Sequence, residues 1–170
     1  MLRAFKSVVV LGSLVAVTGC GKSSVTFNNS LSEANQRIAK AGEAWGLAAA
    51  EAIDGDPSSI QRFKAAQQSL QTVLADVKAD MQALQVPDSP TAKRLYEAHQ
   101  QFLRGQEEIM NNQFAEIGRL VEDTSVAPEA KAQRFMELAM QAEQIESRDL
   151  VPLQQVQRQF ASENGFQLRE

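Results

Sequence analysis

Residues 57–85 read PSSIQRFKAAQQSLQTVLADVKADMQALQ, and the architecture of the chain can be worked out from this segment. Its large apolar residues recur at steps of three, four or seven, namely Ile60, Phe63, Leu70, Leu74, Val77, Met81 and Leu84. That spacing is typical of a helix with one apolar face. Pro57 suits a first helical position, and Pro87 favours an end before it. The segment predicts a long amphipathic helix that must pack against other helices.

Three further segments carry the same helical period. We expect helices at about residues 31–53, 90–122 and 127–164. Glycine and proline cluster at the boundaries between the segments, and the connections of about two to four residues force neighbouring helices to be antiparallel. Residues 30–170 therefore predict an all-α, antiparallel up-down-up-down four-helix bundle.

Several residues are expected to fix the ends and the core of these helices. Caps and stops are expected at Ser30 with Glu33, Asp56, Ser89, Ser125 and Gly165 with Phe166. Trp45 lies among small residues on the apolar stripe of the first helix, which favours a role as a core anchor. Pro152 falls inside the last helix and removes a backbone hydrogen bond, so we expect a kink or break there.

The inventory of reactive residues is small. The chain has 170 residues, a formal net charge of -4, one His and one Cys. A single Cys excludes an internal disulfide, and together with one His it cannot supply the usual four-ligand zinc site. His99 has Tyr96 three residues before it, which excludes the Glu-x-x-His pairs of di-iron bundles, and no Cys-x-x-Cys-His offers haem attachment. We expect no metal, no cofactor and no catalysis.

The N-terminus has the parts of an export signal. Arg3 and Lys6 precede an apolar stretch at residues 7–17, SVVVLGSLVAV, which is too short to cross about 30 Å of hydrocarbon as a helix. The next small residues end in Cys20. Residues 17–20, VTGC, resemble the lipobox of bacterial lipoproteins, with valine in place of the family's usual leucine. The resemblance implies that residues 1–19 are a cleaved signal peptide and that Cys20 is acylated.

The resemblance also implies a location. Several acyl chains on Cys20 would hold the mature chain on a bacterial membrane, facing the periplasm or the exterior. Gly21 stands where an aspartate often retains such proteins at the inner membrane, which favours the outer membrane. The polar residues 20–29 are expected to form a short tether that keeps the body near its bilayer.

Charge limits the choice of partners. From residue 20 onward the chain holds 15 basic and 21 acidic residues, a net charge of -6. This acidic balance argues against nucleic acid and against anionic head groups as partners. We therefore expect contact with the membrane through the lipid alone, and a protein of the cell envelope as the partner.

A second motif overlaps the first. Residues 16–23, AVTGCGKS, fit a relaxed phosphate-loop pattern, with Ala16 at the position of the first glycine. A nucleotide site of this type would need a following helix and then alternating strands with an acidic residue after one of them. The residues that follow are polar and then helical in period throughout, which favours the lipobox interpretation.

Polar residues interrupt the apolar faces of three predicted helices. His99, Gln106 and Gln113 lie seven residues apart at the middle of one face, and each must find a partner or cost about 1–3 kcal/mol. Asp149 and Asn35 fall within the apolar stripes of the last and first helices. Pairing the helices across their turns brings His99, Asn35 and Asp149 to about one level. We expect a hydrogen bond between His99 and Asp149, with the carboxylate raising the pKa of the imidazole.

This candidate polar layer has two interpretations. It is either a ligand, cofactor or proton site, or a device that fixes helix register, as single buried polar residues do in coiled coils. One His without a second base or a nucleophile completes no catalytic set. We expect a non-catalytic interaction or scaffold module of the envelope, and keep as the alternative a small-ligand or cofactor-binding bundle around His99 and Asp149.

Overall fold

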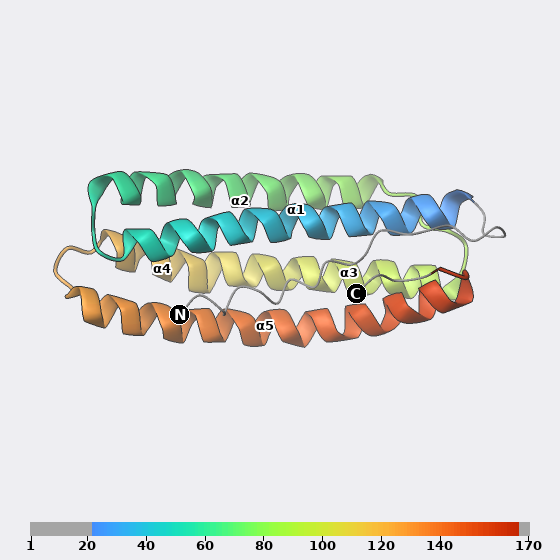
Figure 1. The fold of residues 1–170 in the computed structure, drawn as a ribbon. Helices are drawn as coiled ribbons and strands as arrows, with labels where there is room; N and C mark the ends of the chain where they lie inside the picture. The colour runs from blue at the N-terminus through green and yellow to red at the C-terminus, as the bar shows by residue number, and fades with distance from the viewer. Residues whose placement is uncertain (1–21, 167–170) are drawn as a thin grey trace.

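The computed structural model describes residues 22–166 as a bundle of four antiparallel helical rods (Figure 1). Three rods are the single helices α1 (Lys22–Ala52), α2 (Pro57–Ala83) and α5 (Pro128–Glu163). The other rod joins α3 (Pro90–Ile109), a π-helical turn η1 (Met110–Phe114) and α4 (Ala115–Glu122). The predicted all-α, up-down-up-down bundle is confirmed.

The bundle is built from two helix pairs. The backbones approach most closely between α1 and α2 and between α3 and α5, whereas α1 and α5 hardly approach each other. Aromatic side chains fill the space between the pairs: Trp45 stacks on Phe114 with ring centroids 3.6 Å apart, and Phe63 lies 5.9 Å from Trp45. Trp45 is fully buried, which confirms it as a core anchor.

Most of the predicted helix ends are confirmed. The Asp56 carboxylate accepts a hydrogen bond from the Ser59 backbone N–H at 2.9 Å, and the Ser89 hydroxyl caps α3 in the same way. α5 ends in a Schellman motif, in which Gly165 has a φ of 67° and the Phe166 N–H donates to the Ala161 carbonyl at 2.8 Å. Phe166 is buried, so the motif also closes that end of the core.

The first helix is longer than expected. α1 starts at Lys22, so the tether predicted for residues 20–29 is wrong for residues 22–29, and the capping box at Ser30 and Glu33 is wrong as well. The physical reason is Phe27, which is 1% exposed and packs edge to face on Phe160 of α5 at 5.6 Å. Burial of this ring extends the apolar stripe about one turn beyond the predicted start. Residues 1–21, with the expected signal peptide and Cys20, lie outside the described residues.

The last helix also differs in two details. Its N-cap is Ala127, not Ser125, because the Ser125 N–H and hydroxyl both bond to the Asp123 carboxylate within the preceding loop. Pro152 does not break α5, which is helical throughout. Pro152 itself is exposed, and the buried Asp149 and Leu153 hold the helix against the bundle on either side of it.

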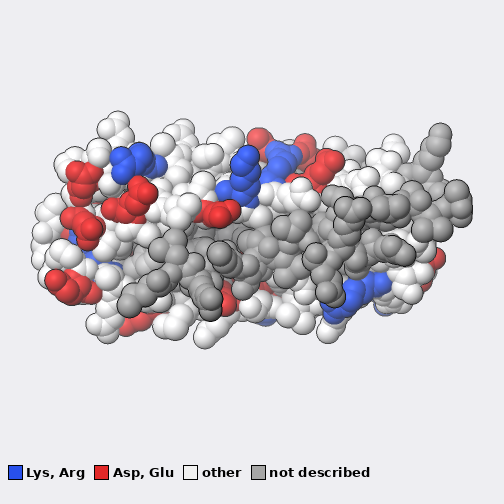
Figure 2. All heavy atoms as spheres, viewed as in Figure 1, with Lys and Arg blue, Asp and Glu red and all other residues white. Residues whose placement is uncertain are grey.

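The outer surface has mixed charge. Figure 2 shows acidic and basic side chains interspersed on the visible face of the bundle. Within residues 22–166 no helix is both long and apolar enough to span a bilayer.

Candidate functional site

His99 lies at the centre of the bundle. α3 carries it fully buried, with Nε2 2.9 Å from Oδ1 of Asn35 in α1, and the edge of Phe102 beside the ring. The geometry fits an Nε2–H that donates to the amide oxygen. The structure therefore brings Asn35 and His99 together, and the expectation that they share one level is confirmed.

The environment of His99 is apolar rather than anionic. Burial lowers the pKa of the imidazole to about 4, and a hydrogen bond with the backbone of Leu31 offsets only part of this shift. The expected rise of this pKa is wrong, because no carboxylate lies against the ring. At pH 7 the ring is neutral, and it acts as a hydrogen-bonding group rather than as a charge.

Asp149 makes other contacts. Its carboxylate accepts hydrogen bonds from Gln101 Nε2 at 3.3 Å and from the Arg148 guanidinium at 2.7 Å, and it lies against Gly105. A Cβ on Gly105 would stand 2.1 Å from Asp149 Oδ2, so only glycine leaves room for the carboxylate. The expected hydrogen bond between Asp149 and His99 is wrong. Asp149 lies against Gly105, six residues along α3 from His99, and its carboxylate is paired there.

Gln106 and Gln113 do not join His99. Both side chains are half-buried, with Gln106 Nε2 and Gln113 Oε1 buried and unpartnered. Seven helical residues span about 10 Å, so these groups lie at separate levels along the rod. The π-helical turn that contains Gln113 also shifts its rotation relative to α3. The predicted layer of five residues therefore reduces to the pair Asn35 and His99.

Three other polar residues are buried near this pair and were missed. Asn28 and Ser32 precede Asn35 on the same face of α1, at steps of four and three residues, and Gln157 lies on α5. With Asn35 and His99 they form a group of five buried polar residues, none of them more than 7% exposed. We call this group the polar seam: Asn28, Ser32, Asn35, His99 and Gln157. The spacing of four and three residues is present in the sequence. It was not recognised because the first helix was predicted to start at residue 31, after Asn28.

Two contacts place Gln157 near the level of the α1 members of the polar seam. Gly105 against Asp149 sets the register of the antiparallel α3 and α5, which brings Gln157 within two residues of the level of His99. The bond from His99 to Asn35 sets the register of α3 on α1. The polar seam is therefore one stretch of the interior, bounded at the end near Asn28 by the rings of Phe27 and Phe160.

Most of the polar seam has no hydrogen-bonding partner. The unpartnered buried atoms of its amide and hydroxyl groups are Asn28 Oδ1 and Nδ2, Ser32 Oγ, Asn35 Nδ2 and Gln157 Oε1. Each buried unsatisfied group costs about 1–3 kcal/mol, so the set costs about 5–15 kcal/mol if it stays dry. That range equals the whole stability of a typical domain.

A second concave feature lies elsewhere. An open groove of about 380 Å³ runs between α2 and α3, lined by Leu74, Lys78, Glu107 and Met110 among others. Lys78 and Glu107 pair with each other across it. The groove thus contains no free charge aimed at a ligand, and it is separate from the polar seam.

Within residues 22–166 no three His, Cys, Asp or Glu side chains are grouped so that they could hold a metal ion. No family model, curated protein or solved structure matches the chain. The polar seam, an uncharged buried group of amides, a hydroxyl and an imidazole, is the site that the described residues support best.

Proposed function

We propose that this protein is a lipid-anchored lipoprotein of the bacterial cell envelope whose helical body acts without catalysis as an interaction or scaffold module. The observation that carries the proposal is VTGC at residues 17–20, preceded by basic and apolar segments and holding the chain's single Cys. Acylation would give this Cys a chemical role. The chain has no second Cys for a disulfide and too few Cys and His residues for the usual zinc site.

The start of α1 adds to this proposal. α1 begins at Lys22, and the chain from Cys20 to Lys22 can reach at most about 7 Å. An acylated Cys20 would therefore hold the bundle directly against the head groups. The α2–α3 connection and the C-terminal end of α5 lie at the same end of the bundle as the start of α1 (Figure 1). The α1–α2 connection and the start of α5, at the opposite end, would be presented to other envelope proteins.

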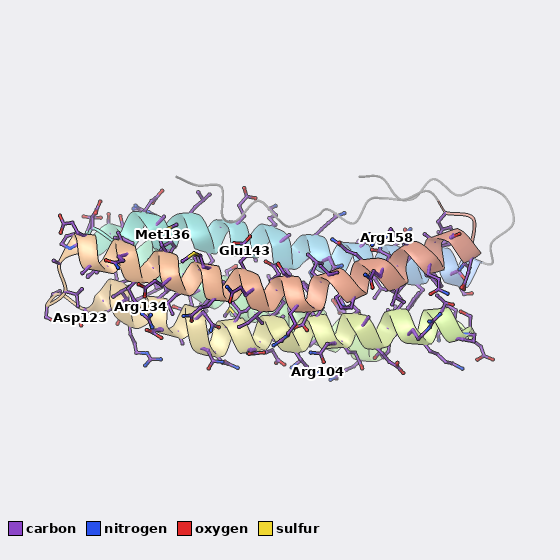
Figure 3. All side chains as sticks on the ribbon, turned by 90° about the horizontal axis from the view of Figure 1, so that it is seen from below. Arg104, Asp123, Arg134, Met136, Glu143 and Arg158 are labelled. Atoms are coloured by element: carbon purple, nitrogen blue, oxygen red, sulfur yellow. The ribbon has the colours of Figure 1, made fainter. Side chains whose placement is uncertain are left out.

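An exposed stripe on α5 supports the interaction role. Met136, Met140 and Val151 are 44%, 53% and 50% exposed, and steps of four and eleven residues place them on one side of the helix. Figure 3 shows Met136 and Glu143 on the side of α5 away from Arg134, whose guanidinium bonds to Glu116 of α4. Large exposed apolar side chains gathered in this way are typical of protein contacts.

The charge beside the stripe indicates the chemistry of the partner. Burial raises the pKa of Glu146, and repulsion from Glu143 raises it further. No Lys or Arg of residues 22–166 forms an ion pair with either glutamate. An envelope protein that presents a helix with apolar and basic residues would complement both features.

Substitution of Cys20 tests the anchor. The Cys20→Ser chain, expressed in a bacterial host, should leave the membrane fraction and incorporate no labelled palmitate. The unaltered chain should stay in the membrane fraction and incorporate the label. The Ser23→Ala chain is the matched control and should behave as the unaltered chain. Sedimentation of the Cys20→Ser chain with the membranes would refute the lipoprotein proposal.

A second candidate function is the binding of a small molecule in the polar seam. The unpartnered atoms of four residues favour it, because they can form hydrogen bonds with a bound molecule: Asn28, Ser32, Asn35 and Gln157. Asp149, placed in this site by the sequence, does not belong to it, because Arg148 and Gln101 already occupy its carboxylate.

A further inference from the structure

The polar seam has more hydrogen-bonding capacity than its own residues satisfy. Asn28 is fully buried, and neither its amide oxygen nor its amide nitrogen has a hydrogen-bonding partner. The buried atoms Ser32 Oγ, Asn35 Nδ2 and Gln157 Oε1 also lack a partner. Buried polar groups in folded proteins are almost always paired with protein or with ordered water. Five such atoms within one stretch of the interior therefore indicate an occupant.

The residues of the polar seam cannot satisfy one another as they stand. Asn28, Ser32 and Asn35 follow one face of α1, and they span about 10 Å along the helix. Gln157 approaches from α5, which hardly approaches the backbone of α1. None of these unpartnered amide and hydroxyl atoms is hydrogen-bonded to another residue.

The chemistry of the polar seam limits what can occupy it. Its unpartnered groups are two amide N–H₂ groups and a hydroxyl, which can donate, and two amide oxygens, which accept. None of its members is an acid, a lysine or an arginine, and the nearest buried carboxylate, Asp149, is paired with Arg148. An ion would find no counter-charge there, so the occupant is uncharged.

We propose that the polar seam is a binding site for a small uncharged hydrogen-bonding guest held between α1, α3 and α5. Two kinds of occupant share this chemistry. One is a row of ordered water molecules, each making about three hydrogen bonds, and the other is one small neutral solute with hydroxyl or amide groups. The inference deepens the second candidate function, and it holds whether or not Cys20 is acylated.

Apolar substitutions of similar size test for an occupant. Asn28→Leu and Gln157→Met in the full chain remove hydrogen-bonding groups without opening a large cavity. If a guest is bound, both variants lose its hydrogen bonds, and the thermal midpoint should fall by about 2–8 °C. If the polar seam is dry, the same variants remove an unpaired polar group, and the midpoint should rise. Asn29→Leu and Gln155→Met, at exposed neighbouring positions, are the matched controls.

Two measurements identify the source. Nuclear Overhauser contacts between long-lived water and the Asn28 side-chain amide protons, absent in Asn28→Leu, would show ordered water. Mass spectrometry of the native full chain, before and after denaturation, would show a released neutral solute. The two variants are in different helices, so one that fails to fold leaves the other as the test.

The outcomes separate this inference from the proposed functions. Water contacts with a lower midpoint support the inference and assign the site to solvent, which removes the second candidate function. A released solute with a lower midpoint supports the inference and that function together. A raised midpoint, with neither water contacts nor a solute, overturns the inference and leaves the lipoprotein proposal untouched.

Discussion

At the residue scale, the α1 neighbour of His99 could be predicted, whereas its expected α5 neighbour could not. Turn lengths sufficed to place Asn35 beside His99, because they fix how far each helix runs. Asp149 was predicted beside His99, but it faces Gln101 and Gly105 instead. A single sequence does not show that Gly105 leaves space for the Asp149 carboxylate, because the two residues meet only when α3 packs against α5.

The pH dependence of stability tests the environment of His99. Its pKa in the folded chain is about 4, below the unfolded value of about 6.5, so the unfolded chain binds more protons between these values. The free energy of unfolding should therefore fall as the pH drops from about 6.5 to 4, by about 3 kcal/mol from this group.

Denaturant titrations of the unaltered chain and of His99→Gln measure this contribution. Every other titrating group is common to both chains, so the difference between the two pH profiles isolates the imidazole. Identical profiles would show that His99 is not buried as a neutral ring.

Gly105 and Asp149 provide a second test at this scale. Gly105→Ala places a methyl group where the Asp149 carboxylate lies, and it should lower the free energy of unfolding by about 1–3 kcal/mol. The cost should shrink in an Asp149→Ala background, so that a double-mutant cycle shows coupling. Gly42→Ala has nothing within 4 Å of the new methyl and should be neutral or stabilising. Equal costs in both backgrounds would contradict the contact.

At the element scale, helix type and most boundaries followed from the sequence, and the exceptions have local causes. Asp56, Ser89 and Gly165 end their helices as predicted, because capping depends on a few adjacent residues. The start of α1 was missed because burial of Phe27 against α5 is a tertiary contact. The π-helical turn at Met110–Phe114 was missed too, and it carries Phe114 onto Trp45.

The exposed stripe on α5 makes the next prediction. A photo-crosslinking amino acid at Met140 should capture one discrete envelope protein in intact cells, while the same group at the exposed Gln141, which lies on another side of the helix, should not. Met136→Lys should abolish capture from position 140, because it places a charge within the apolar contact, one turn from Met140. Equal capture from both positions, or capture insensitive to Met136→Lys, would contradict a specific surface.

At the scale of the whole molecule, the fold could be predicted because it follows from the period of the apolar residues and from the short connections. The site could be predicted only in part. The sequence indicated that polar residues enter the core near His99, but the members of the polar seam depend on how widely α1 and α5 are separated. The proposed role of the molecule rests on the motif at residues 17–20.

The chemical state of Cys20 tests the proposed lipid anchor most directly. Mass spectrometry of the protein extracted from bacterial membranes should find a chain that begins at Cys20, with acyl groups on that residue. A chain that keeps residues 1–19 and carries an unmodified Cys20 thiol would contradict the account.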